Sequence, residues 1–400
     1  MVKQLEGLRV LDLTNVLAGP FCAYQMALLG AEVIKVEKPG SGDLARQLGA
    51  DVELNRRYMG ASFLAQNAGK KSLSLNLKSE IGKKVFLKLV KTADALIENF
   101  RPGVMDRLGL GYEDLKKIKP DLVYCAISGF GKDGPLKNNP AYDQIIQGMS
   151  GVMSITGNEE CAPLRVGYPV ADTMGGITAA FATTAALFKR ERTGQGEYID
   201  VSMLESTIVA MGWAVSNWLI AGVEAKPIGN ENMTASPSGT FITGEGLLNI
   251  AANRQTQFVK LCHVLGRPDL IEDMRFKDRE ARKLYRTELK QELESELRKN
   301  KASYWALLLN DNDIPAGEVL NIPDILVHPQ TVGRGLIKKF HSVDGADRDI
   351  SVVRSGFRLN SGDPKPATPP PVLGQDNDSI LTSLGYSSSE IESLKQQEIV

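Results

Sequence analysis

The residue that points most directly to chemistry is Asp172, an acid followed closely by the glycine pair Gly175 and Gly176. The apolar residues 165–171 contain one glycine and one proline and predict a buried strand or loop, whereas residues 177–188 predict an apolar helix. Asp172 is therefore expected where an extended segment meets a helix N-terminus. By itself such an acid is most simply a helix cap, stabilised by the helix dipole. The two glycines add a second interpretation, because they would let a ligand or another backbone come close.

Other reactive side chains are scarce. The 400 residues include three histidines and four cysteines, without a C-x-x-C pair. Only Cys262 stands beside a histidine, His263. This usage disfavours a histidine-based zinc site and a Ser-His-Asp triad, and it favours buried free thiols in a reducing compartment. We expect no metal centre and no prosthetic group.

Length and charge set the wider frame. A chain of 400 residues exceeds one comfortable core, so two domains are expected. The formal net charge is −1, which gives no reason to expect nucleic acid or an anionic membrane as partner. The apolar runs at 177–188 and 207–223 are short and interrupted by polar residues, unlike membrane spans. A strand begins close to Met1 and leaves no room for a leader, so we predict a cytoplasmic protein.

The first half alternates strand and helix patterns. Apolar or alternating runs predict five strands, at 8–13, 31–37, 73–77, 95–98 and 122–127. Helical patterns lie between them, at 19–29, 81–91, 103–108 and 112–118. This alternation predicts an α/β domain with a doubly wound, mostly parallel sheet.

The second half is mainly helical and then changes character. Helices are expected at 142–150, 174–189, 202–222, 255–265 and 278–299, with a loop at 230–238 and a hairpin at 239–252. A proline-rich arm at 363–371 precedes a last helix at 387–397. The predicted domains are a large α/β domain at 1–200 completed by 330–400, a helical linker at 201–229 and a small α+β domain at 230–329.

Several segments in chain order resemble the class III coenzyme A transferases (CaiB/BaiF type), a family that also contains the α-methylacyl-CoA racemases. The matching segments are 5–14, 16–20, 30–43, 67–72, 98–103, the Asp172 segment, 193–196 and 369–374. The resemblance implies an interlocked homodimer of two-domain chains. It also aligns Asp172 with the acid that becomes acylated.

The chemistry implied by the resemblance is covalent catalysis. A free carboxylate is a poor electrophile, and an enzyme carboxylate splits the difficult step into easier ones. Asp172 would pass through a mixed anhydride and an aspartyl-CoA thioester, with CoA thioesters and carboxylic acids as substrates. A helix N-terminus would hold it ionised. Backbone N–H groups near Gly175 and Gly176, or on a facing loop, would stabilise each oxyanion.

Coenzyme A carries phosphates, so a neutral protein needs local cations at strand ends to bind it. The expected CoA contacts are Val16, Lys38, Lys70, Lys71, Ser72, Leu73, Asn99, Phe100, Arg101 and Arg107. The expected substrate or oxyanion contacts are Leu17, Ala18, Arg46, Tyr142, Gly175 and Gly176.

Departures from the family pattern narrow the reaction. The racemases carry His where this chain has Tyr142, so a transferase is favoured. Formyl-CoA:oxalate transferases tend to carry Gln at Leu17 and a polyglycine loop that residues 232–238 lack, which disfavours that reaction. A transferase using succinyl-CoA or a similar donor and a dicarboxylate such as succinate, malate, citramalate, itaconate or mesaconate remains. Its second cation would be one of Arg46, Arg56, Arg57 and Arg165. Carnitine-type acids and a non-catalytic CoA-binding protein are the alternatives.

Overall fold

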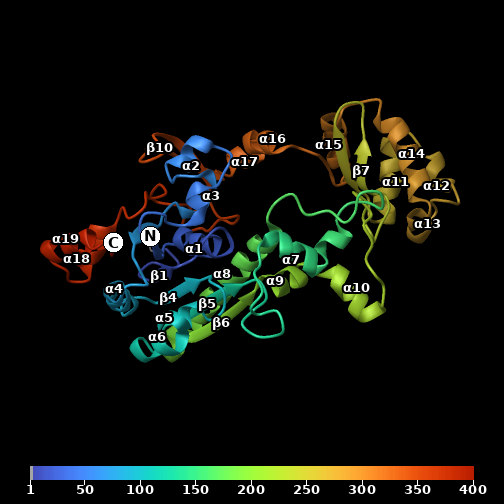
Figure 1. Ribbon diagram of the computed structural model, residues 1–400. Coiled ribbons are helices and arrows are strands. Elements are labelled where there is room, and N and C mark those ends of the chain that lie inside the picture. The colour runs from blue at the N-terminus through green and yellow to red at the C-terminus, as the bar shows by residue number, and fades with distance from the viewer. Residues whose placement is uncertain (1–2) are drawn as a thin grey trace. The chain divides into compact units, whose positions relative to one another are not determined.

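A computed structural model describes residues 3–400, which fall into two compact units (Figure 1). The larger unit contains the chain up to Val152, Arg165–Glu224 and Arg334–Val400, and the smaller contains Met153–Leu164 and Ala225–Gly333. Two predicted boundaries were wrong. The predicted linker belongs to the larger unit as far as Glu224. Residues 153–164 belong to the smaller unit, where the carbonyl of Gly157 accepts a 2.7 Å hydrogen bond from the N–H of Gly229.

The larger unit is built on a six-stranded parallel sheet of order β3-β2-β1-β4-β5-β6. Its strands are β1 (Arg9–Asp12), β2 (Glu32–Glu37), β3 (Lys71–Ser74), β4 (Ala95–Glu98), β5 (Val123–Ser128) and β6 (Glu197–Ser202). The first five match predicted strands. The prediction missed β6, a half-buried edge strand whose acids Glu197 and Asp200 interrupt the apolar pattern.

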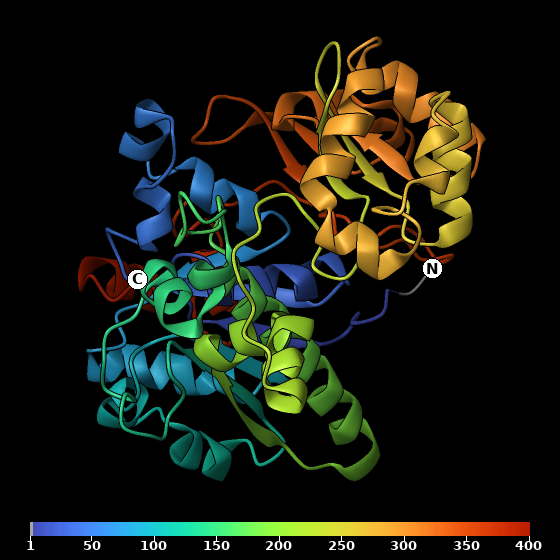
Figure 2. The same cartoon turned by 90° about the vertical axis from the view of Figure 1, so that its right-hand side faces the viewer.

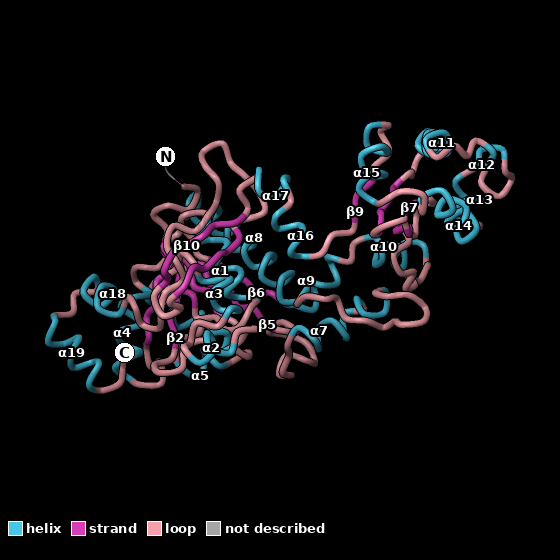
Figure 3. Tube along the Cα trace, turned by 90° about the horizontal axis from the view of Figure 1, so that it is seen from above, coloured by secondary structure: helices cyan, strands magenta, loops and turns pink. Residues whose placement is uncertain are grey.

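Side chains alternate between two cores on the opposite faces of this sheet. Val10 and Val33 face one core, whereas their neighbours Leu11 and Ile34 face the other. The first core is covered by α1 (Ala18–Leu28), α7 (Asp143–Ser150), α8 (Val170–Thr193) and α9 (Met203–Ala210). The second is covered by α4 (Glu80–Val90), α5 (Val104–Leu108), α6 (Tyr112–Ile118), α18 (Asn377–Ser383) and α19 (Ser388–Gln396). Helices on both faces of a parallel sheet confirm the predicted α/β fold class (Figure 3, strands in magenta).

The C-terminal segment completes the large unit. Backbone groups of β3 at Ser72 and Ser74 bond to Asp376 and Asn377, so the arm covers the free edge of the sheet. A hairpin of β10 (Ile337–Val343) and β11 (Arg348–Val353) packs with the 3-10 helix η1 (Leu44–Gln47), α2 (Val52–Arg56) and α3 (Ala61–Asn67) against the outer side of α1.

The remaining helix of the larger unit is α10 (Trp213–Ala221), whereas the 3-10 helix η2 (Val152–Ile155) begins with the last residue of that segment and otherwise belongs to the smaller unit. The helix predicted at 202–222 is divided into α9 and α10 at Gly212, whose φ of 46° breaks the helix. No helix within residues 3–400 has the length and apolar character of a membrane span.

The smaller unit is α+β (Figure 2, yellow and orange). Its antiparallel sheet of β7 (Ser238–Ile242), β8 (Leu247–Ala251) and β9 (Ala316–Glu318) contains the predicted hairpin. The helices are α11 (Gln255–Val264), α12 (Asp269–Glu272), α13 (Arg279–Leu284), α14 (Arg286–Leu297), α15 (Ala302–Asp311), α16 (Ile322–Val327) and α17 (Pro329–Gly333).

Candidate active site

Asp172 is the third residue of α8, so it lies in the first turn of the helix and not at the N-cap position. The N-cap position is Pro169, which has no side chain able to accept the free N–H groups. Asp143, the first residue of α7, supplies the missing acceptor. Its Oδ1 accepts from the backbone N–H of Ala171 at 2.9 Å and of Asp172 at 3.4 Å. The interpretation of Asp172 as a cap was therefore wrong, because Asp143 has that role.

Asp172 lines a cavity of about 390 Å³ in the larger unit. Most of the wall comes from loops that follow the strands: Asn15, Val16 and Leu17 after β1, and Asn99 to Pro102 after β4. In the order β3-β2-β1-β4-β5-β6 the chain reverses direction across the sheet between β1 and β4. Open α/β sheets bind ligands at this switch point, outside the carboxyl ends of the strands. The topology therefore brings Asp172 to a ligand-binding position.

The electrostatic setting of Asp172 differs from the sequence expectation. Burial, together with the charge of Asp143, raises the pKa of the Asp172 carboxyl from 3.8 to about 7. The expected stabilisation of the anion by the helix N-terminus is thus outweighed. A carboxylate with a raised pKa is more basic and binds a carbonyl carbon more strongly, which suits a nucleophile.

The glycine pair is explained by helix packing. A Cβ on Gly176 would lie 2.5 Å from the carbonyl oxygen of Ala18, and one on Gly175 would lie 2.9 Å from Cγ of Met203. Both glycines are buried, and α8 packs on α1 and α9 there. Of the two sequence interpretations, the approach of another backbone is the one observed. Gly176 stands one turn after Asp172, so it brings the first residue of α1 close to the turn that carries the acid.

This packing changes which backbone groups are candidate oxyanion donors. Gly175 and Gly176 are the sixth and seventh residues of α8, where N–H groups donate within the helix. The first N–H groups of α1, at Ala18 and Gly19, have no carbonyl four residues back inside a helix. Among residues 3–400 they have no hydrogen-bond acceptor. Of the predicted oxyanion contacts, Ala18 carries one of these N–H groups and Leu17, which precedes it, lines the Asp172 cavity, so both are better candidates than the glycine pair.

The loops that carry these groups are tied together. The side chain of Asn99 accepts from the N–H of Asn15 and donates to its carbonyl, both at 2.8 Å. The side chain of Glu98 accepts from the N–H of Phe100 at 2.7 Å and so stabilises the loop that follows β4. Val16 has a φ of 67°, a left-handed conformation that is strained for a β-branched residue. Three predicted contacts, Val16, Asn99 and Phe100, thus lie on the cavity wall.

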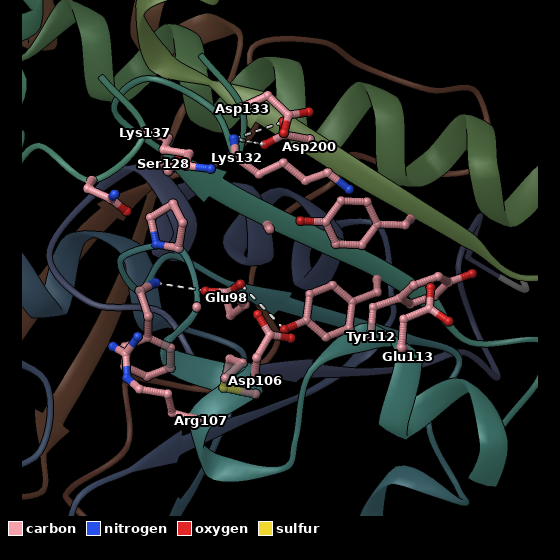
Figure 4. Close-up of a pocket in the computed structure, with 18 residues that line it drawn as sticks. Glu98, Asp106, Arg107, Tyr112, Glu113, Ser128, Lys132, Asp133, Lys137 and Asp200 are labelled. Atoms are coloured by element: carbon pink, nitrogen blue, oxygen red, sulfur yellow. Dashed lines mark hydrogen bonds between the residues drawn. The ribbon is translucent and has the colours of Figure 1, made fainter. Parts of the chain in front are cut away.

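A second cavity of about 570 Å³ adjoins the first and shares Phe100, Pro102, Ser128 and Lys137 with it (Figure 4). Burial raises the pKa of Glu98 on its wall to about 7. Figure 4 also shows Arg107, a predicted CoA contact, at the edge of this second cavity.

The cations of the Asp172 cavity are Arg101, which the sequence predicted, and Lys137, which it missed. Both are exposed, and neither forms an ion pair within the described part of the chain. Lys137 lies outside every matched motif. Its only signal is its place in the loop after β5, where ligand contacts are common in this fold.

Several predicted CoA contacts lie elsewhere. Lys70 is buried and donates to Asp12 at 2.8 Å, and burial lowers its pKa to about 8. Ser72 and Leu73 are buried within the edge strand β3. Lys71 is the first residue of β3, so it stands at the end of the sheet opposite the switch point, where it pairs with Glu32 at 2.6 Å. In this structure the side chains of these four residues are buried or paired with another protein group, and a contact with CoA stays a prediction. Lys38 remains exposed just after β2.

The arginines predicted as the second substrate cation differ in their burial and in their partners. Arg46 is fully buried and forms a bidentate ion pair with Glu37, with hydrogen bonds of 2.7 and 2.8 Å, so it cannot reach a substrate. Arg57 pairs with Glu53 and Asp347, and Arg56 lies 4.0 Å from Glu53. Arg165 lies 3.4 Å from Asp143. Tyr142 is 67% exposed and lines the Asp172 cavity.

Within residues 3–400 there is no group of three or more His, Cys, Asp or Glu side chains placed to hold a metal ion. Cys22, Cys125 and Cys262 are buried and free, whereas Cys161 is free and exposed.

The fold and the cavity together define an α/β protein with a nucleophile-like carboxylate at the switch point of a parallel sheet. Residues 5–377 match the model of CoA-transferase family III, and the chain belongs to that family of transferases. The resemblance found in the sequence is thereby confirmed.

Similar proteins cover nearly the whole chain. It is 37% identical to succinyl-CoA:glutarate CoA-transferase of Mus musculus, over 98% of this chain and 89% of that protein. It is 41% identical to acetyl-CoA:oxalate CoA-transferase of Acetobacter aceti, over 84% of this chain and 85% of that protein. The crystal structure of a CAIB/BAIF family protein from Brucella suis matches with a TM-score of 0.84 at 34% identity, covering 96% of this chain and all 100% of that one.

Proposed function

We propose that this protein moves coenzyme A from succinyl-CoA, or a similar acyl-CoA, to a dicarboxylate, with Asp172 as the nucleophile. The observation that carries the proposal is the position of Asp172, a half-buried acid at the switch point of the sheet in a chain of CoA-transferase family III. The similar mouse protein is named for transfer between succinate and glutarate, which are both dicarboxylic acids.

The reaction proceeds in two symmetrical halves. The Asp172 carboxylate attacks the thioester carbonyl, the C–S bond breaks, and a mixed anhydride and CoA thiolate form. The thiolate then attacks the aspartyl carbonyl, so the donor acid leaves and an aspartyl-CoA thioester remains. The acceptor carboxylate attacks that thioester to give a second anhydride and free thiolate. Attack of the thiolate on the acceptor acyl carbon releases the new acyl-CoA and restores Asp172.

The surroundings of Asp172 support each step. With a pKa of about 7, the carboxyl is partly ionised at neutral pH and reacts as the anion. The free N–H groups at the start of α1 are the donors for the oxyanions, and loss of one such donor typically costs about 100- to 1000-fold in rate.

Coenzyme A would lie along the two adjoining cavities. The cations placed for its phosphates are Arg101 in the Asp172 cavity, Lys137 in the shared region, Arg107 in the second cavity and Lys38 after β2. A phosphate group is bound by such flexible cations as well as by backbone N–H groups.

Oxalate is a second candidate acceptor, since the similar Acetobacter protein is named for acetyl-CoA and oxalate. Oxalate is also a dicarboxylate, but a shorter one. The sequence disfavours formyl-CoA:oxalate transfer because of Leu17 and the missing polyglycine loop at residues 232–238, but neither feature bears on an acetyl-CoA donor.

The proposal also includes the homodimer that the resemblance implies. Helix α8 exposes Ile177, Phe181 and Phe188 on one face, and α10 exposes a further apolar group, Trp213, Trp218, Leu219 and Ile220. A soluble monomer seldom exposes so many large apolar side chains together. A second copy of the chain would cover them, and sedimentation should give twice the chain mass. A monomer at micromolar concentration would contradict the dimer. The cytoplasmic location stays a prediction.

The function is tested with purified protein, succinyl-CoA or acetyl-CoA as donor, and a panel of acceptors from oxalate to glutarate. We expect CoA transfer to at least one dicarboxylate. Asp172→Ala should lower kcat by more than about 10⁴-fold, as removal of a nucleophile does. Asp143→Asn, a matched change of the neighbouring acid, should retain transfer. Equal activity in Asp172→Ala and wild type would overturn the mechanism, and no transfer to any acid would overturn the function.

A further inference from the structure

Four buried charged side chains form a network beneath the wall of the Asp172 cavity. Asp12 ends β1, Lys35 lies on β2, Asp43 precedes η1 and Lys70 precedes β3. All four side chains have 0% exposure. Lys35 lies 3.0 Å from Asp43 and 3.8 Å from Asp12, and Lys70 lies 2.8 Å from Asp12. Two acids and two bases thus compensate one another, without reaching the cavity itself.

The network holds the backbone of residues 14–20 at successive points. Nζ of Lys35 donates to the carbonyl of Thr14 at 2.8 Å. Oδ1 of Asp43 accepts from the N–H of Val16 at 2.9 Å. Nζ of Lys70 donates to the carbonyl of Pro20, in the first turn of α1, at 2.9 Å. The same segment contributes Asn15, Val16 and Leu17 to the cavity wall.

Val16 shows why this segment needs to be held. Its φ of 67° is unfavourable for a valine, and such a conformation persists only where the surroundings impose it. The turn at Val16 directs the chain into α1, whose free N–H groups begin within two residues. Without the bond from Asp43, the backbone of Val16 would relax and the start of α1 would shift.

A buried ionic network is poor evidence for stability alone, because apolar residues of the same size often stabilise a protein as well or better. A second buried ion pair in the same region, Arg46 and Glu37, can be compared with the network. Arg46 and Glu37 are also buried, with 0% and 2% exposure. Oε1 of Glu37 accepts from the backbone N–H of Asp43 at 3.0 Å, but none of the pair's side-chain hydrogen bonds reaches residues 14–20. The two ionic groups therefore differ in what they hold.

We propose that Asp12, Lys35, Asp43 and Lys70 are positioning residues that hold residues 14–20 in the strained form required for CoA transfer. The network touches no substrate and acts through the backbone of Thr14, Val16 and Pro20. This inference rests on the proposed function of the Asp172 cavity.

The test compares Lys35→Met with Arg46→Met in steady-state CoA transfer, at temperatures where both variants are folded. Lys35→Met should lower kcat by about 100-fold, the effect of a misplacement near 1 Å, with a smaller change in KM for the acyl-CoA. Arg46→Met should lower the melting temperature but lower kcat much less than Lys35→Met does, because Glu37 still accepts from the N–H of Asp43. If Lys35→Met fails to fold, Asp43→Ala serves in its place, because it removes both the acceptor of the Val16 N–H and the nearer anion of Lys35.

A rescue experiment separates positioning from general destabilisation. Glycine adopts the conformation of Val16 without strain. In the Val16→Gly background, the kcat loss caused by Lys35→Met or Asp43→Ala should therefore be several-fold smaller than in the wild-type background. An unchanged kcat in both network variants, or the same loss in both backgrounds, would overturn the inference. Failure of wild type to transfer CoA would instead overturn the proposed function.

Discussion

Asp12 and Asp172 are two acids of the same α/β unit, and their surroundings are opposite. Asp12 is fully buried, and although burial by itself raises its pKa, Lys35 and Lys70 lower the pKa below its ordinary value. Asp172 is less buried, but burial and the charge of another acid, Asp143, raise its pKa to about 7. The two pKa values differ because cations neutralise the charge of Asp12 but not that of Asp172, and not because one acid is more deeply buried. Where burial is compensated, the acid supports the fold, and where it is not, the acid is poised to react.

Glu98 belongs with Asp172 in this comparison. It is buried, no cation among residues 3–400 is bonded to it, and burial raises its pKa to about 7. Its partners are the N–H of Phe100 and the hydroxyl of Tyr124, so it orders the loop that lines both cavities.

Removing compensation should give the largest change in stability. Lys70→Met leaves Asp12 with only the more distant Lys35, and breaking a buried pair typically costs about 3–5 kcal/mol. The free energy of unfolding, measured with urea, should fall by an amount in that range. The control is Lys71→Met, since the exposed Lys71–Glu32 pair is worth less than about 1 kcal/mol. Similar losses for both lysines would show that Lys70 has no special role.

Removing the uncompensated charge of Asp172 should stabilise the protein. The folded pKa of Asp172 lies above the unfolded value of 3.8, so its burial lowers stability progressively between about pH 4 and pH 7, and fully above pH 7. Asp172→Asn removes this penalty. Its gain in unfolding free energy should be about 2.5 kcal/mol larger at pH 8 than at pH 5. A gain independent of pH would mean that Asp172 is not the group with the raised pKa.

The smallest expected effect shows how much of the raised pKa of Asp172 is due to the charge of Asp143. Asp143→Asn removes the charge but leaves an amide oxygen that can accept from the N–H of Ala171. We expect kcat/KM of wild type to rise with pH through about 7, and the midpoint to fall by about one pH unit in the variant. An unshifted profile would assign the raised pKa to burial alone. Other charges near the acid are Arg165, Arg101 and Lys137, and they stay unchanged.

The sequence predicted the sheet well because its signal is local. Apolar runs such as residues 122–127 and 95–98 report their own strands, whereas β6 at 197–202 mixes acids with apolar residues and was missed. The position of Asp172 near a helix start was predicted within a few residues.

The site was harder to predict where a side chain depends on distant partners. Lysines 70 and 71 look alike in sequence, but only Lys70 meets Asp12, which lies 58 residues earlier. Asp143 caps a helix that begins 27 residues later, and nothing local indicates this role. Gly176 was noticed in the sequence, but its partner, the carbonyl of Ala18, is visible only in the packed structure.

The most direct test is to trap the aspartyl-CoA thioester. Wild-type protein mixed with acyl-CoA without acceptor is quenched, cleaved after lysine and arginine, and analysed by mass spectrometry. Peptide 166–189 contains Asp172 as its only acidic side chain, so an adduct there identifies the residue directly. We predict a CoA adduct on this peptide in wild type and Asp143→Asn, and none in Asp172→Asn. Turnover without an adduct on peptide 166–189, or an equal adduct in Asp172→Asn, would contradict the account.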